Sequence, residues 1–90
     1  MIHSLSGGII ADYDKLIYVF VNIEDGFDAG QKRWYISPFP KIAVGDRVSV
    51  PVGQGSKLCR GKVERVEIVT KQTAPYPVNR TREVDGILYD

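Results

Sequence analysis

Few residues in this chain have side chains suited to covalent or metal chemistry. Cys59 and His3 are its only cysteine and histidine, and His3 lies at a terminus, where chains commonly fray. A Cys–His nucleophile needs the two side chains within hydrogen-bonding reach, and a structural zinc site needs four nitrogen or sulfur ligands. The sequence therefore predicts a protein that is not an enzyme, with no catalytic residues, no metal site and no cofactor.

Two short motifs are better explained as turns than as ligand sites. The Asp-Tyr-Asp sequence at 12–14 lacks the length and spacing of a calcium-binding loop. The Gly-Gln-Gly sequence at 53–55 precedes no Gly-Lys-Ser/Thr and opens no expected helix, so it does not predict a phosphate-binding loop. We expect a turn at the first position and a hairpin connection at the second.

Basic residues close to aromatic residues are the remaining candidates for a binding site. Lys32 and Arg33 directly precede Trp34 and Tyr35. Other basic residues form two later groups: Lys57, Arg60, Lys62 and Arg65, then Arg80 and Arg82. Cations that contact phosphates, combined with aromatic rings that stack on bases, are typical of proteins that bind single-stranded nucleic acid. The alternatives are a tryptophan that anchors the core and charges that keep exposed strands soluble.

Composition limits the class of protein. With 90 residues, 43% hydrophobic and 26% charged, the chain is predicted to form a single domain over 1–90, with residues 1–14 either part of it or a short N-terminal extension. A single cysteine allows no internal disulfide, so we expect a reduced, cytoplasmic setting. No stretch approaches the roughly 18 to 20 apolar residues of a membrane helix, so no membrane association is expected.

Charge is distributed unevenly along the chain. Residues 1–30 hold one lysine and five acidic residues, a net charge of −4, and residues 31–90 hold eleven basic and six acidic residues, a net charge of +5. Together they give the formal net charge of +1. The later residues would suit a polyanion if their basic side chains share one surface, and would not if both signs are interspersed.

Alternating hydrophobicity predicts strands and almost no helix. Residues 16–24 alternate between an aliphatic face, expected in the core, and an opposite face, expected to be exposed; the first holds Ile17, Val19, Val21 and Ile23, and the second holds Tyr18 and Phe20. Further strands are predicted at 32–37, at 47–52 after a Gly45-Asp46 turn, and at 59–70. Pro51 cannot donate to a ladder, which places it at an edge, a strand end or a bulge.

A break in the alternation predicts curvature in the last of these strands. Val63 falls on one face of 59–70, whereas Val66 and Ile68 fall on the other, as a β-bulge or a strongly coiled strand would produce. Residues 72–80 are expected to be extended because of their prolines, and 82–90 to form a short strand or one helical turn. With a further short strand at 9–11, the predicted fold class is all-β, a small single-domain β-barrel of about five to six strands.

The order of these segments resembles the N-terminal DNA-binding domain of primosomal protein N′, the replication-restart helicase PriA. That family has an aromatic-rich strand ending in Tyr, two residues and Pro, which Tyr35 to Pro38 match, and a Gly-x-Arg-Val-x-Val-Pro-Phe-Gly strand, which 45–53 match with Val52 in place of Phe. Its Gly-x-Val strand matches 61–63. The resemblance covers roughly residues 16–88 and implies a small β-barrel that binds the 3′-terminal nucleotide of a DNA strand.

The resemblance also implies pocket residues, with two departures. Tyr35, Gly53 and Arg82 fall on pocket positions, Arg82 in place of a lysine. The family's Phe-Asp-Tyr falls on Arg33-Trp34-Tyr35, so the phenylalanine and the acidic residue of the pocket are missing. The helicase that follows in that family does not follow here. We therefore expect a stand-alone domain with little selectivity for strand ends.

Two classes of function remain after these exclusions. The first is a nucleic-acid-binding module that contacts single-stranded or fork DNA through Arg33, Trp34, Tyr35, Gly53, Lys57, Arg60, Lys62 and Arg82. The second is a non-catalytic adaptor whose protein partner binds the Tyr18 and Phe20 face or an open sheet edge. Neither class has a small-molecule substrate.

Overall fold

Strands account for nearly all the regular structure of the residues that the structure describes. The computed structural model describes residues 15–89, so the turn expected at 12–14 and the strand expected at 9–11 lie outside the described residues. The strands are β1 (Leu16–Ile23), β2 (Lys32–Ile36), β3 (Arg47–Val52), β4 (Lys57–Val69) and β5 (Gly86–Leu88). A 3₁₀-helical turn, η1 (Val78–Arg80), lies in the proline-rich segment. The predicted all-β class is confirmed.

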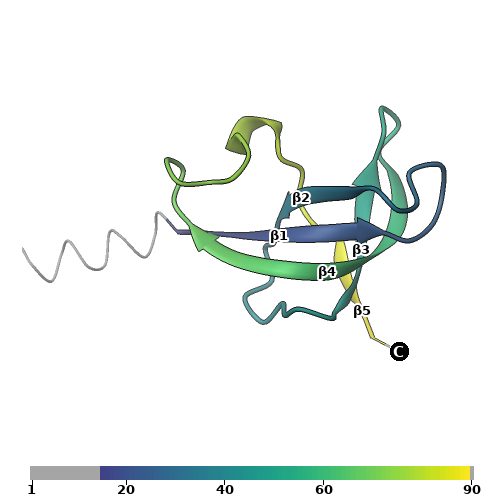
Figure 1. Cartoon of the computed structure of the whole chain (residues 1–90), viewed down its shortest axis with the longest axis horizontal. Coiled ribbons are helices and arrows are strands. Elements are labelled where there is room, and N and C mark those ends of the chain that lie inside the picture. The colour runs from purple at the N-terminus through teal and green to yellow at the C-terminus, as the bar shows by residue number, and fades with distance from the viewer. Residues whose placement is uncertain (1–14, 90) are drawn as a thin grey trace, which may run out of the picture.

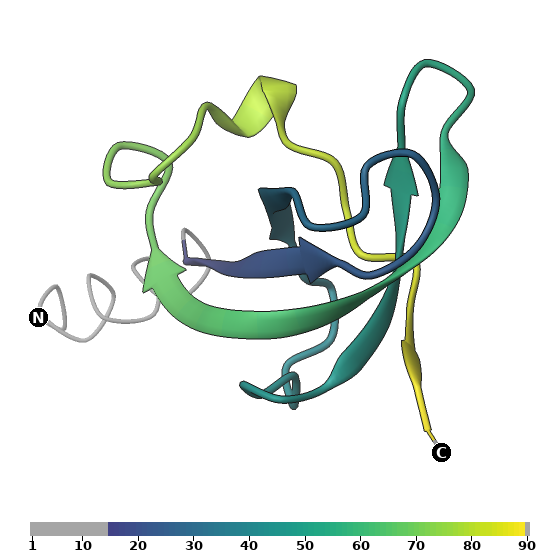
Figure 2. The same ribbon diagram turned by 45° about the vertical axis from the view of Figure 1, so that its right-hand side comes forward.

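The strands form one antiparallel sheet in the order β2-β1-β4-β3-β5. The long strand β4 curves so that its second half pairs with β1 and its first half with β3 (Figures 1 and 2). Residues 70–82, which we call the arch, lead from the end of β4 back toward β2 (Figure 2). β5 then pairs with the first half of β3.

Closure into a barrel was predicted and is wrong. β2 and β5 lie at opposite ends of the strand order, and in residues 15–89 the chain before β5 meets β2 only at an isolated parallel bridge between Ile36 and Glu83. β5 pairs along β3 instead, and beyond Ile36 the outward edge of β2 has no strand partner among residues 15–89. The sheet is therefore curved but open.

The predicted break in β4 is a β-bulge. The register against β1 shifts between Phe20 and Val21, whose partners on β4 are Arg65 and Val63. The additional residue, Glu64, lets Val63 and Val66 both face the β1 side chains of the core, although simple alternation would separate them.

The core is built from the predicted aliphatic face of β1. Val19, Val21 and Ile23 are fully buried, and Ile17 packs against them while half-buried. The other main core residues are Tyr35, Ile42, Val48, Val50, Val52, Val63 and Val84. A Cβ atom at Gly61 would clash with the Val21 side chain, which explains the glycine in the middle of β4.

The opposite face of β1 is not exposed as predicted. Tyr18 is fully buried and Phe20 is half-buried. The reason is tertiary: the arch covers Tyr18, and the indole of Trp34 packs on Phe20 with ring centroids 4.8 Å apart. The surface proposed for an adaptor's partner is therefore largely covered.

Candidate functional site

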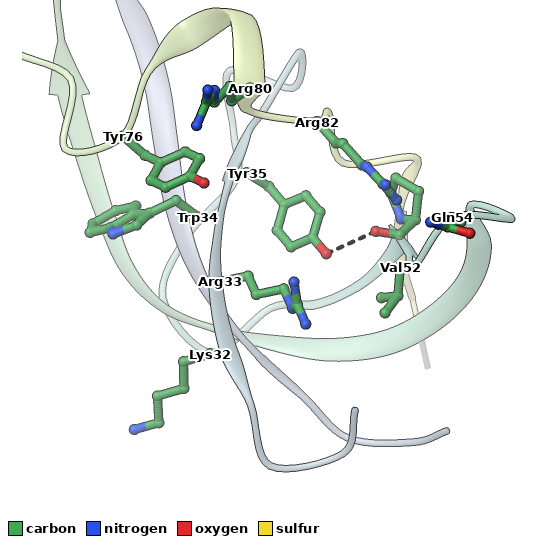
Figure 3. Close-up of a pocket in the computed structure, with 11 residues that line it drawn as sticks. Lys32, Arg33, Trp34, Tyr35, Val52, Gln54, Tyr76, Arg80 and Arg82 are labelled. Carbon is green, nitrogen blue, oxygen red and sulfur yellow. Dashed lines mark hydrogen bonds between the residues drawn. The ribbon is translucent and has the colours of Figure 1, made fainter. Parts of the chain in front are cut away.

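A single open pocket of ≈ 500 Å³ brings together most of the predicted site residues. It lies between β2, the turn that follows β3 and the arch (Figure 3). Its lining residues are Lys32, Arg33, Trp34 and Tyr35 of β2, Pro51, Val52, Gly53 and Gln54 at the turn, and Tyr76, Arg80 and Arg82 of the arch. Segments separated by about half the chain thus form one site.

The pocket is basic, because four cations and no carboxylate line it. Lys32 and Arg33 form ion pairs at the rim, Lys32 with Glu64 (2.9 Å) and Arg33 with Asp28 (3.1 Å). Arg80 and Arg82 form no ion pair within the part of the chain that the structure describes. Their charges are therefore available to an anionic ligand.

Tyr35 forms the inner wall of the pocket. Its hydroxyl donates a hydrogen bond to the carbonyl of Pro51 (2.9 Å), which joins β2 to the end of β3 (Figure 3). Burial raises the pKa of the phenol above its ordinary 10.0, and the nearby charges of Arg33 and Arg82 only partly oppose that effect. The phenol therefore stays neutral at physiological pH, and its hydrogen bond is structural.

Two other aromatic rings lie on the opposite side of β2. Trp34 is half-buried against Phe20, and the guanidinium of Arg65 lies over its indole at 5.6 Å. Tyr76, from the arch, is 45% exposed and lies near Trp34 at the pocket (Figure 3). Tyr76 is thus the more accessible ring for stacking.

The backbone N–H and C=O groups of β2 point alternately toward the partner strand β1 and toward the pocket. The N–H of Ser37 donates to the carbonyl of Ile17 (2.8 Å), and the N–H of Ile23 donates to the carbonyl of Gln31 (2.9 Å). Since backbone groups in an antiparallel pair point alternately toward and away from the partner, the odd-numbered residues of this region pair with β1. The even-numbered residues point to the free edge.

Part of that free edge has no partner. Ile36 uses both its groups, donating to the carbonyl of Arg82 (2.9 Å) and accepting from the N–H of Val84 (2.9 Å). Lys32 and Trp34 point the same way, and no hydrogen bond to their outward N–H or C=O groups is formed within residues 15–89. The pocket therefore holds a free carbonyl on Lys32 and a free donor and acceptor on Trp34.

Five of the eight predicted site residues line the pocket, and three do not. Arg33, Trp34, Tyr35, Gly53 and Arg82 line it. Gly53 has φ +76° and would meet nothing within 4 Å if it carried a Cβ, so the turn requires glycine for its backbone conformation. Lys57, Arg60 and Lys62 lie along β4 instead, and whether they contact a ligand stays a prediction.

Tyr76 and Gln54 line the pocket but were not among the predicted site residues. Tyr76 stands between two prolines in a segment with no strand pattern, and only the return of the arch toward β2 brings it to the site. An exposed aromatic residue in a proline-rich connection was the available signal.

Cys59 is separate from this site. It is buried on β4, beside Gly26 of the β1–β2 connection. The described residues hold no group of three His, Cys, Asp or Glu side chains placed to bind a metal, and none of their helices is long and apolar enough to cross a membrane.

Comparison with known proteins adds no family assignment. The chain matches no protein-family model, no curated protein and no solved structure. The resemblance to the DNA-binding domain of primosomal protein N′ therefore stays a hypothesis that rests on the residues quoted above.

Proposed function

We propose that the protein is a cytoplasmic, non-catalytic module that binds single-stranded nucleic acid, including the single-stranded part of a DNA fork, in this pocket. The observation that carries the proposal is the combination of four cations, three aromatic rings and no carboxylate around one hollow. Cations on a groove and rings that stack on bases are the two parts of sequence-tolerant single-strand binding.

Each part of the pocket has a separate role in the proposal. Arg80 and Arg82 contact phosphates, since neither has an ion-pair partner among the described residues. Tyr76 and the accessible part of Trp34 stack on a base. The carbonyl of Lys32 and the N–H of Trp34 lie next to each other on the free edge and match the adjacent donor and acceptor on the hydrogen-bonding edge of a nucleobase.

The free edge of β2 also favours the second candidate, an adaptor that adds a partner's extended peptide to the sheet. Two features weigh against it. Only Lys32 and Trp34 have open backbone groups there, because Ile36 is already paired, whereas strands usually run for about five or six residues. The surrounding cations would also require an acidic peptide.

A salt titration separates the two candidates. We expect a labelled single-stranded oligonucleotide to bind at low salt, and its affinity to fall between about 50 and 200 mM salt with a slope that reflects about two to four phosphate contacts. Fluorescence anisotropy measures both quantities. If no oligonucleotide of any base composition binds at low salt, the nucleic-acid proposal fails and the adaptor takes its place.

A further inference from the structure

The arch has few hydrogen bonds to the sheet. Within the described residues, those that reach positions 70–81 from the sheet involve one side chain: the hydroxyl of Tyr18 donates to the carbonyl of Tyr76 (2.9 Å) and lies 3.2 Å from Oγ1 of Thr81. The next attachment along the chain is the Ile36 to Arg82 backbone bond. The middle of the arch is thus held by the hydroxyl of one β1 residue.

Because the Tyr18 side chain is buried, its hydroxyl can bond only to other groups of the protein. Tyr18 is fully buried, with its ring 6.2 Å from that of Trp34, so its hydroxyl must find protein partners, because an unpaired buried donor is costly. Oγ1 of Thr81 donates its one proton to the carbonyl of Pro77 (2.6 Å) and so closes the turn that holds Arg80, and the same oxygen contacts the Tyr18 hydroxyl. The hydroxyl therefore sets where the arch lies relative to β1 and its neighbour β2.

We propose that Tyr18 is a positioning residue for the pocket. It lines no part of the pocket itself, but its hydroxyl donates to the backbone of the stacking residue Tyr76 and contacts Thr81, and these two residues flank the segment that carries Arg80. Arg82 follows directly after Thr81 in the chain. This inference rests on the proposed function, since it assigns Tyr18 the role of holding these side chains at the distance from β2 that a nucleotide requires.

Tyr18→Phe tests the proposal, because it keeps the ring and removes the hydroxyl. We expect the affinity for a labelled single-stranded oligonucleotide to fall about fivefold, the effect of losing one buried hydrogen bond. We also expect faster amide hydrogen exchange at Arg80 and Thr81 in the free protein, with exchange in β1 and β4 unchanged.

Ser37→Ala is the matched control. It also removes a buried hydroxyl, one that donates to the carbonyl of Phe39 (3.0 Å) in the β2–β3 connection. We expect it to lower stability without changing the affinity or the exchange of the arch. If Tyr18→Phe unfolds the protein, Thr81→Val, at a half-buried position of the arch, is expected to change exchange and affinity in the same direction.

A double-mutant cycle with Tyr76→Leu distinguishes positioning from general stability. If Tyr18 acts through Tyr76, the double variant loses less affinity than the sum of the two single losses. Additive losses, or an unchanged affinity and unchanged arch exchange in Tyr18→Phe, would overturn the inference. If the unmodified protein binds no oligonucleotide, the proposed function fails, and the exchange comparison alone decides whether Tyr18 positions the arch.

Discussion

Two basic regions of the molecule carry similar charge but differ in everything else that a binding site needs. The pocket joins Arg80 and Arg82 of the arch to the aromatic residues and free backbone edge of β2. Strand β4 carries Arg60 and Lys62 within a ladder that is paired on both sides, with β1 and with β3. Backbone groups in such a ladder are already used, and no aromatic ring neighbours these cations in the register.

The difference shows that a run of basic residues does not by itself define a binding site. Residues two apart on a strand share a face, so Arg60 and Lys62 lie in one row along β4, whereas the pocket cations come from two separate segments. Cations converge around a hollow only where separate segments meet, as the arch and β2 do here.

The largest effect is expected from a charge placed in the core beneath both basic regions. Val21 is fully buried between Arg33 on β2 and Val63 on β4. Val21→Asp should unfold the protein, because an unpaired buried charge costs several kcal/mol, comparable with a total stability of about 5–15 kcal/mol. Circular dichroism measures the loss, and Val44→Asp, at a valine that is 61% exposed, should stay folded. A soluble, folded Val21→Asp variant would show that the core face is misassigned.

The next largest effect is expected from replacing two cations of the pocket. Arg80→Gln combined with Arg82→Gln should lower affinity for single-stranded DNA at least tenfold at low salt, which corresponds to about 1.4 kcal/mol. The slope of log affinity against log salt should become shallower by about 1.4, because each lost phosphate contact on a single strand contributes about 0.7. Anisotropy titrations at several salt concentrations measure both. An unchanged slope would mean that these arginines do not contact phosphates.

A smaller effect is expected when the 3′ end of the oligonucleotide is changed. If the resemblance to the primosomal protein N′ domain holds, Trp34 takes the place of an acidic pocket residue. A carboxylate can accept hydrogen bonds from a terminal sugar, whereas an indole has one donor and no acceptor. Oligonucleotides with a free 3′-hydroxyl and with a 3′-phosphate should therefore bind within about threefold of each other, less than 1 kcal/mol apart. A preference of tenfold or more for the free hydroxyl, measured on the matched pair, would mean that another pocket residue recognises the end.

The smallest effect is expected on β4. Arg60→Gln combined with Lys62→Gln removes the same total charge as the pocket double variant, so it is the matched control for it. We expect affinity to change less than about twofold, because neither side chain lines the pocket and interactions between exposed charges that are not in contact are weakened by salt. Equal losses in the two double variants would show that net charge, rather than the pocket, determines binding.

Much of the local structure was predictable from the sequence. The alternation of 16–24 correctly assigned Val19, Val21 and Ile23 to the core, and the break around Val63 correctly indicated a bulge. Both depend on the two-residue period of a strand, which is a local property. The closure of the sheet and the exposure of Tyr18 were predicted incorrectly, because both depend on where the arch and β5 lie after folding.

The candidate site was likewise only partly predictable from the sequence. Residue types and order alone showed that the sequence holds one cysteine and one histidine, and that Arg33, Trp34 and Tyr35 form a basic and aromatic run on a strand. Only the tertiary structure decided that Tyr76 and Arg80 join that run, and that Lys57, Arg60 and Lys62 of β4 do not line the pocket. The physical reason is that the alternation that predicts a strand is local, whereas the arch follows no such period and meets the sheet through long-range contacts such as the hydrogen bond from Tyr18 to Tyr76, 58 residues away in sequence.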